Sequence, residues 1–299
     1  MRFDVITLFP ELFAPLLSAG VTRRAFESGL VEVRLWNPRD HAEGNYRRVD
    51  DRPFGGGPGM VMLAEPLERC LQAIWQDKAV TASAAKQSTS EGSPRFARDD
   101  TSPVTAIASS LAMTEAKQSS AEDCFASLAM TGCPVVLFSP IGERLNHASV
   151  QSWSDSDGAV LLCGRYEGID QRFIDRHVTH QISLGDFVLS GGEIAAMALL
   201  DAVARLQPGV LNDEGSHQFD SFNPAIDGLL DSPHFTRPEV WQGQAVPEAL
   251  LSGHHERIAR HRREQSLATT ARWRPDVIES VRAAGRLSPA DEAFLRDLL

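Results

Sequence analysis

Two short and almost wholly apolar runs constrain the fold of this chain more than any other feature. They are PVVLFSP at residues 134–140 and GAVLLCG at 158–164, and a further β-rich run, FDVITLF, occupies residues 3–9. Continuous apolar strands of this length are typical of parallel sheets, because helices cover both faces of such sheets. Helical patterns lie at 65–76, 169–178 and 192–206. Strands that alternate with helices predict an α/β fold with a parallel sheet.

Residues 79–132 interrupt this pattern. The segment is rich in Ala, Ser and Thr, and it repeats itself, with AKQS at 85–88 and 116–119 and SLAMT at 110–114 and 127–131. A folded repeat module would need an apolar core that this composition does not supply. Loop-closure entropy grows only slowly with loop length, so a fold tolerates a long insertion. We therefore expect a disordered, repeat-derived insertion over 79–132.

The last third of the chain has a different character. Residues 209–233 are polar and rich in turn-forming residues, and helical patterns follow them to the last residue. We therefore expect one α/β domain over 1–208, an interdomain linker over 209–233 and a small all-α domain over 234–299.

Composition limits the location and the class of site. The 299 residues carry a formal net charge of −11, and the four cysteines form no C-x-x-C pair. No apolar run approaches the roughly 18 residues of a membrane span, and Asp4, Pro10 and Glu11 interrupt the apolar start of the chain. We therefore expect a cytoplasmic protein with no membrane association, no zinc site and no disulfide framework.

One segment is basic although the net charge of the chain is negative. Residues 254–274 contain six arginines and two glutamates. A solvated helical face with internal ion pairs explains this segment, and so does a nucleic-acid-binding surface on a small helical module. Its first residues, HHERIARH, do not have the H-E-x-x-H spacing of a zinc hydrolase.

The glycine-rich stretch RPFGGGPGM at residues 52–60 does not match the common nucleotide loops. A P-loop needs Lys and then Ser or Thr after its last glycine, but Met60 and Val61 follow Gly59. A dinucleotide-binding loop must follow a buried strand, but charged residues precede this one. The stretch is either a mobile surface loop or a loop that contacts a ligand or partner.

Three other glycine-marked turns follow apolar strands, at 138–145, 163–170 and 183–193. Ligands of α/β sheets gather outside the carboxyl ends of the strands, so these turns together predict one pocket. The nearly apolar helix after the third turn carries Asp201 and Arg205 on one face, four residues apart. Either a surface ion pair or burial at a subunit interface explains this placement.

Eight segments, in their order along the chain, resemble the bacterial tRNA (guanine-N1)-methyltransferases of the TrmD family. They are LFPELF, WNPRD, VDDRPFGGGPGM, CGRYEGID, GDFVLSGGE, DAVAR, DSPHFTRPEVW and SGHH. The resemblance covers the chain except for 79–132. It implies a SPOUT-type parallel sheet with a C-terminal trefoil knot and an obligate homodimer with active sites at the subunit interface. The implied reaction is methyl transfer from S-adenosylmethionine to N1 of the guanine 3′-adjacent to the anticodon of tRNA, position 37.

The resemblance also implies roles for single residues. Asp220 corresponds to the general base and comes from the other subunit in the family, and Arg205 corresponds to the catalytic arginine that stabilises charge on guanine O6. The residues that would bind the methyl donor are Phe138, Ser139, Pro140, Gly164, Tyr166, Glu167, Gly168, Leu184, Gly185, Asp186, Phe187, Val188, Leu189 and Gly191. The residues that would bind tRNA are Arg52, Gly55, Gly56, Gly57, Arg257, Arg260, Arg262 and Arg263.

Some points stay open at this stage. The family suggests assistance by a divalent ion such as Mg²⁺, with Glu167 as the nearest candidate, although the residues themselves indicate no metal site. Leu137, Ile141 and Phe187 replace residues that are common in the family, which leaves their contacts to the donor in question. A tRNA-binding protein without catalysis and a methyltransferase acting on another RNA are the alternative functions.

Overall fold

The computed structural model describes residues 1–90, 133–212 and 215–298. The chain divides into two units, which are Met1–Leu145 with Asp155–Asp201 and Asn146–Ser154 with Ala202–Leu299. The greater part of the predicted insertion, residues 91–132, lies outside the described residues. The predicted domain and linker borders stay predictions.

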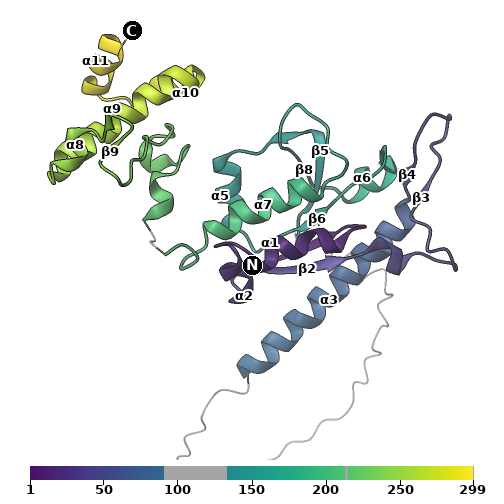
Figure 1. Ribbon diagram of the computed structural model, residues 1–299. Coiled ribbons are helices and arrows are strands. Elements are labelled where there is room, and N and C mark those ends of the chain that lie inside the picture. Colours follow the sequence, from purple (N-terminus) through teal and green to yellow (C-terminus); the bar gives the residue numbers. More distant parts are fainter. Residues whose placement is uncertain (91–132, 213–214, 299) are drawn as a thin grey trace, which may run out of the picture. The chain divides into compact units, whose positions relative to one another are not determined.

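A five-stranded parallel sheet forms the centre of the first unit (Figure 1). Its order is β2-β1-β6-β5-β8, and every neighbouring pair is parallel. The strands are β1 (Arg2–Ile6), β2 (Glu32–Trp36), β5 (Val135–Arg144), β6 (Val160–Leu162) and β8 (His180–Ser183). The α/β fold and the parallel sheet predicted from the apolar runs are therefore confirmed.

The apolar runs form the core of this unit. Val160 and Leu162 of β6 and Ile6 of β1 are wholly buried, and they pack in one cluster with Leu71 and Ile74 of helix α3 (Ala64–Ser90). Burial of one such side chain contributes about 1.5–3 kcal/mol to folding. The sheet is thus a rigid base from which the loops at its carboxyl edge project.

The helix predicted over 65–76 is longer in the structure. Helix α3 (Ala64–Ser90) continues because residues 77–90 contain no Gly or Pro and are rich in Ala, the strongest helix former. The beginning of the segment expected to be disordered, residues 79–90, is therefore helical. The next helix breakers, Gly92 and Pro94, lie outside the described residues.

Shorter elements complete the first unit. A second sheet has the order β3-β4-β7, from β3 (Asp50–Asp51), β4 (Val61–Met62) and β7 (Gly168–Ile169). Such two-residue strands are too short to be predicted from alternation. The remaining elements are η1 (Pro10–Phe13), α1 (Ala14–Ser18), α2 (Arg23–Glu27), η2 (Pro38–His41) and α6 (Gln171–His177).

Helix α7 (Glu193–Arg205) begins in the first unit and ends in the second. The second unit has a small core of its own, in which Leu267, Ile278 and Leu295 are buried. Its regular elements are helices, apart from a hairpin of β9 (Val240–Trp241) and β10 (Gln244–Ala245). Its other elements are α5 (His147–Ser154), η3 (Ser216–Phe219), η4 (Pro224–Ile226), α8 (Glu248–Leu251), α9 (His255–Trp273), α10 (Pro275–Ala283) and α11 (Pro289–Leu298).

Among the helices of the described residues, none combines the length and the apolar content that crossing a bilayer requires.

Candidate functional site

The three glycine-marked turns meet in the first unit. Residues 137–140 of β5, the turn at 164–169 after β6 and the loop at 182–192 after β8 line a cavity of about 290 Å³. Because β5, β6 and β8 are parallel, their carboxyl ends lie at the same edge of the sheet. The structure thus brings together the turns that the sequence placed in one pocket.

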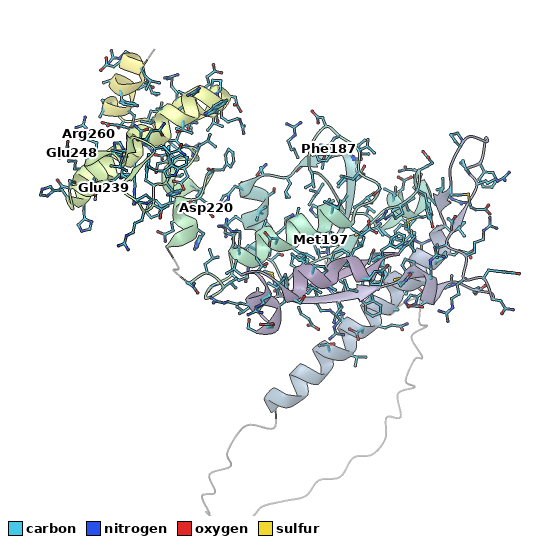
Figure 2. The ribbon with its side chains drawn as sticks, in the orientation of Figure 1. Phe187, Met197, Asp220, Glu239, Glu248 and Arg260 are labelled. Atoms are coloured by element: carbon cyan, nitrogen blue, oxygen red, sulfur yellow. The ribbon has the colours of Figure 1, made fainter. Side chains whose placement is uncertain are left out.

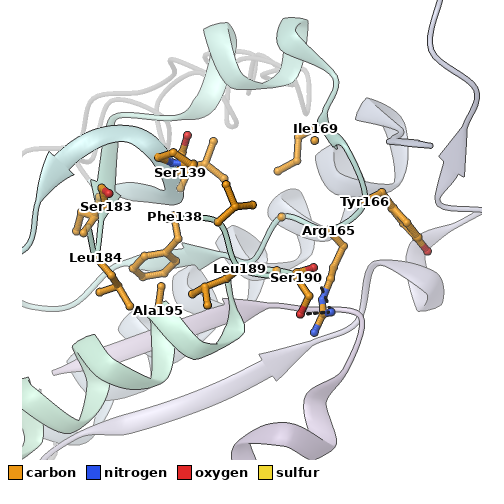
Figure 3. Close-up of a pocket in the computed structure, with 18 of the residues that line it drawn as sticks. Phe138, Ser139, Arg165, Tyr166, Ile169, Ser183, Leu184, Leu189, Ser190 and Ala195 are labelled. Atoms are coloured by element: carbon orange, nitrogen blue, oxygen red, sulfur yellow. Dashed lines mark hydrogen bonds between the residues drawn. The ribbon is translucent and has the colours of Figure 1, made fainter. Parts of the chain in front are cut away.

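All but one of the residues predicted to bind the methyl donor line this cavity. In Figure 3 the ring of Phe138 lies among Leu184, Leu189 and Ala195, while the side chain of Tyr166 points away from them. Asp186 is the exception. Its side chain is 90% exposed and pairs with Arg144 at 2.8 Å, because a carboxylate is cheaper to keep in water than to bury against apolar walls.

Backbone forms much of the cavity wall. A Cβ on Gly192 would lie 2.9 Å from Cα of Cys163, and a Cβ on Gly191 would lie 2.3 Å from Nε of Arg165. Only glycine permits such approaches. Tyr166 has φ +63°, a left-handed conformation that is costly for a residue with a side chain. The turn is therefore held in its shape by its surroundings.

A buried ion pair supports this wall. Glu193, the first residue of α7, is 1% exposed, and its carboxylate lies 2.9 Å from Nε of Arg165 and accepts a hydrogen bond of 2.9 Å from the Thr7 hydroxyl. Nη1 of Arg165 donates to the carbonyl oxygen of Ser190 at 3.3 Å (Figure 3). The guanidinium also lies 4.5 Å from the ring centroid of Phe9. These contacts join two walls of the cavity to the end of β1.

The buried thiols of Cys163 and Cys70 are unreactive. Burial, reinforced by the charge of Glu193, raises the pKa of the Cys163 thiol well above its ordinary value. Burial likewise raises the pKa of Cys70 to about 12. Both are therefore neutral thiols near neutral pH, and neither is a nucleophile there.

The glycine-rich loop is attached to the same cavity. Gly55, Gly56, Gly57 and Gly59 all have positive φ, so the loop conformation requires glycine. A Cβ on Gly59 would lie 2.3 Å from Cγ of Glu167, and the Glu167 N–H donates to the carbonyl oxygen of Met60 at 2.9 Å. Strand β4 then pairs with β7. The loop therefore ends against the cavity wall, a contact that the sequence did not indicate.

The two predicted catalytic residues contact each other in the second unit. Nη1 of Arg205 donates to Oδ2 of Asp220, and Nη2 donates to Oδ1 at 3.3 Å. In the described chain no ion pair joins Arg205 to Asp201, which is exposed. The intrahelical pair considered from the sequence is therefore replaced by a pair with a residue of the loop that follows η3.

The arginines predicted to bind tRNA fall into two groups. Arg263 lies between Asp227 and Asp291, at 2.9 Å from each; Arg260 pairs with Glu264 at 2.8 Å, and Arg257 with Glu248 at 3.6 Å. Figure 2 labels Arg260 and Glu248. Arg262 and Arg52 are exposed and contact no carboxylate of the described chain through their side chains. Ion pairing therefore accounts for Arg257, Arg260 and Arg263, and the nucleic-acid-binding surface stays a prediction.

Within residues 1–90, 133–212 and 215–298, no three His, Cys, Asp or Glu side chains are grouped as a metal site requires. Glu167 stands against Gly59 rather than in a cluster of acids.

Sequence reasoning missed the supporting residues of the cavity, chiefly Arg165, Glu193 and Thr7. One signal pointed to Glu193, because it is the only charged residue in the otherwise apolar first two turns of α7. Its partner could not be found from spacing, since Thr7 and Glu193 are 186 residues apart.

Comparison with known proteins gives consistent matches. The family described as tRNA (Guanine-1)-methyltransferase TrmD matches residues 1–101 and 95–280. A tRNA (guanine-N(1)-)-methyltransferase of Paracidovorax citrulli is 62% identical, covering 100% of this chain and 98% of that protein. Proteins of the same name from a Polaromonas species and from Bordetella pertussis are 61% and 50% identical, each over 100% of this chain and over 97% and 98% of their own lengths.

Proposed function

Because this chain belongs to the tRNA (guanine-1)-methyltransferase TrmD family and is a methyltransferase of that class, we propose that it methylates guanine N1 at position 37 of tRNA with S-adenosylmethionine as the donor. The observation that carries the proposal is the glycine-walled cavity at the carboxyl edge of the sheet. The order of the family motifs along the chain supports the choice of substrate.

The cavity fits such a donor. Backbone groups of Gly164, Gly185 and Gly191 line it beside the apolar side chains of Phe138 and Leu189. Apolar walls with a few placed polar groups are the usual lining of a small-molecule site. When bound, S-adenosylmethionine supplies an electrophilic methyl group on a sulfonium. The residues of the cavity bind this donor, orient it and exclude water.

Asp220 and Arg205 act on the guanine. Neutral guanine carries a proton on N1, and Asp220 accepts that proton as the methyl group arrives, an effect typically of about 10²–10⁴-fold on the rate. Negative charge then develops on O6, where the guanidinium of Arg205 stabilises it. N1 and O6 are neighbours on one edge of the base, so the paired carboxylate and guanidinium present the two groups that this edge requires.

The proposal includes the features that the resemblance implies for the assembly. These are the trefoil knot, an obligate homodimer in which Asp220 serves the partner's donor cavity, and action in the cytoplasm. Exposed apolar side chains beside the donor cavity, of Ile141, Val188 and Ile194, are consistent with a face that a second copy covers. No metal ion is assigned a role.

Methyl transfer from labelled S-adenosylmethionine tests the proposal. The substrates are a tRNA transcript with guanine after the anticodon and the same transcript with adenine there. Label only on the guanine transcript supports the donor, the substrate and the position together. Label on neither transcript, with tRNA still bound, would refute the proposed reaction, and equal label on both would refute the position.

A further inference from the structure

One lysine and one cysteine of the first unit are in contact, although they lie 55 residues apart in the chain. Nζ of Lys78, in α3, donates to Sγ of Cys133, which lies just before β5, at 3.0 Å. Cys133 also packs against the apolar cluster of this unit. In the sequence the pair flanks residues 79–132, the segment predicted to be an insertion, so it joins the two positions where the α/β fold meets that segment.

A buried carboxylate faces the same amine. Asp4 of β1 is wholly buried, and its Oδ1 accepts hydrogen bonds from Arg2 at 2.6 Å and from Nε1 of Trp36 at 2.9 Å. Its Oδ2 lies 3.3 Å from Nζ of Lys78 and accepts no hydrogen bond from the described residues. A buried polar atom that lacks a hydrogen bond is unusual in folded proteins. This oxygen is placed to accept a proton from the Lys78 ammonium.

Cys133 differs from the two other cysteines of the described residues. Cys70 and Cys163 are buried, and burial raises the pKa of both thiols, whereas Cys133 is partly exposed. A small oxidant therefore has access to its sulfur. Oxidation converts a thiol to a sulfenic acid, which condenses with a neighbouring nitrogen to form a sulfur–nitrogen bond. The Lys78 amine is the nitrogen that stands beside this sulfur.

We propose that Cys133 and Lys78 form a covalent sulfur–nitrogen bridge when hydrogen peroxide oxidises the protein. In the first step the sulfur of Cys133 attacks the peroxide, the O–O bond breaks, an S–OH group forms and water leaves. In the second step Asp4 accepts a proton from the Lys78 ammonium, and the free amine attacks the sulfur. The S–O bond then breaks, and the hydroxide leaves as water with a second proton from the nitrogen. The sulfur loses two electrons and the peroxide gains them.

The surroundings suit this product. The second step removes the charges of Lys78 and Asp4 together, so it leaves no new unpaired charge in the buried site. Arg2 keeps a carboxylate, because it also pairs with Asp77 at 2.7 Å. A thiol reverses the bridge by attacking the sulfur, which releases the amine and forms a mixed disulfide that a second thiol reduces. The bridge is thus a reversible link across residues 79–132.

Peptide mapping of the full-length protein after peroxide treatment tests the proposal. The protein carries Cys124→Ser, which removes the fourth cysteine as a disulfide partner. We expect a linked pair of peptides, one with Lys78 and one with Cys133, whose mass is two hydrogen atoms below the sum of the separate peptides. A thiol reductant should separate them.

Lys78→Arg is the matched variant, because a guanidinium keeps the positive charge beside Asp4 but stays protonated and does not attack sulfur. It should give no linked pair, and dimedone should trap about tenfold more sulfenic acid at Cys133 than in the protein with lysine. Peroxide should raise the urea midpoint of the protein with lysine, since a cross-link restricts the unfolded chain. It should not raise the midpoint of Lys78→Arg or of Cys133→Ser.

Three results would overturn the proposal. They are equal dimedone labelling of Cys133 in the two proteins, a Cys133 thiol that stays reduced at peroxide concentrations that oxidise free cysteine, and a linked pair that retains an additional oxygen atom. If Lys78→Arg does not fold, the peptide map of the protein with lysine decides the question by itself. The outcome is independent of the proposed reaction, because none of Asp4, Lys78 and Cys133 lines the donor cavity.

Discussion

The cavity of the first unit and a cavity of about 680 Å³ in the second unit differ in the groups that line them. In the first unit, backbone at glycine turns and apolar side chains form most of the walls, and Arg165, which also lines the cavity, pairs with the buried carboxylate of Glu193. In the second unit, side chains of one helix face and of 3₁₀ turns form the lining, and neither Arg262 nor His255 pairs with a carboxylate of the described residues. Rigid backbone suits a small ligand of constant shape, whereas exposed cations suit a charged polymer.

The largest effect should come from Asp220→Asn, which retains the shape of the residue but removes the base. The rate of methyl transfer in a single turnover should fall about 10²–10⁴-fold. Donor affinity measured by calorimetry should not change, because Asp220 acts on the guanine and is not among the residues that line the donor cavity. Asp297→Asn, on the exposed end of α11, is the matched control. A rate within tenfold of the unmodified protein would remove Asp220 from its proposed role.

Arg165→Met should show how far donor binding depends on the ion pair between Arg165 and Glu193. The substitution leaves the carboxylate of Glu193 buried without its cation, which typically costs about 3–5 kcal/mol. Urea denaturation should report this loss in the free energy of unfolding, and calorimetry should report weaker donor binding. Thr7→Val removes the hydrogen bond to Glu193 and the one that the Thr7 hydroxyl accepts from the Phe9 N–H, but leaves the ion pair, and we expect a loss of about 1–2 kcal/mol. An Arg165→Met protein of normal stability would contradict the network's supporting role.

Arg263→Gln should separate structural arginines from binding arginines. Arg263 joins α9 to Asp227 and to Asp291 of α11, so its loss should destabilise the protein by about 1–2 kcal/mol. Its effect on tRNA affinity, measured by titration with the guanine transcript, should be smaller than that of Arg262→Gln. If Arg263→Gln weakened tRNA binding more than Arg262→Gln, Arg263 would belong to the RNA-binding surface of the protein.

The ion pair between Arg263 and Asp291 should also make the free energy of unfolding depend on pH. Burial acts to raise the pKa of Asp291, but hydrogen bonds from Arg263 and Ser288 outweigh it and hold that pKa below its ordinary value. The stabilisation is therefore present above the ordinary pKa of about 4 and is lost as the pH falls through the lower pKa of the folded protein. The stability difference between the unmodified protein and Arg263→Gln should be constant from neutral pH to about pH 5 and should shrink in more acidic solution.

The smallest effect should come from Asp186→Asn. The pair between Asp186 and Arg144 is exposed, and such pairs contribute at most about 1 kcal/mol. Donor affinity should stay within about twofold of the unmodified protein. Its neighbour is the contrasting case, because a Cβ on Gly185 would lie 3.1 Å from the Phe187 ring and φ is +153°. Gly185→Ala should therefore weaken donor binding more than Asp186→Asn. The opposite result would indicate that Asp186 contacts the donor, as the sequence predicted.

Local patterns predicted much of the fold. The strands β1, β5 and β6 and the helices α6, α7 and α9 lie where apolar periodicity placed them. The sequence also indicated that the three glycine turns share one pocket, because parallel strands end at one edge. Strands of two residues, such as β3 and β7, carry too little pattern to be found, and the low complexity of residues 77–90 hid the extension of α3 to Ser90.

The sequence by itself determined the family, through motifs that are ordered along nearly the whole chain, and the parallel sheet, through runs that can only be buried. Only the tertiary structure decided how charges are paired. Arg262 and Arg263 are adjacent in sequence and identical in type, yet one is bound between two carboxylates and the other is exposed. Pairing of this kind depends on which distant residues the fold brings within about 4 Å, and for residues far apart in the chain, type and spacing carry no information about that distance.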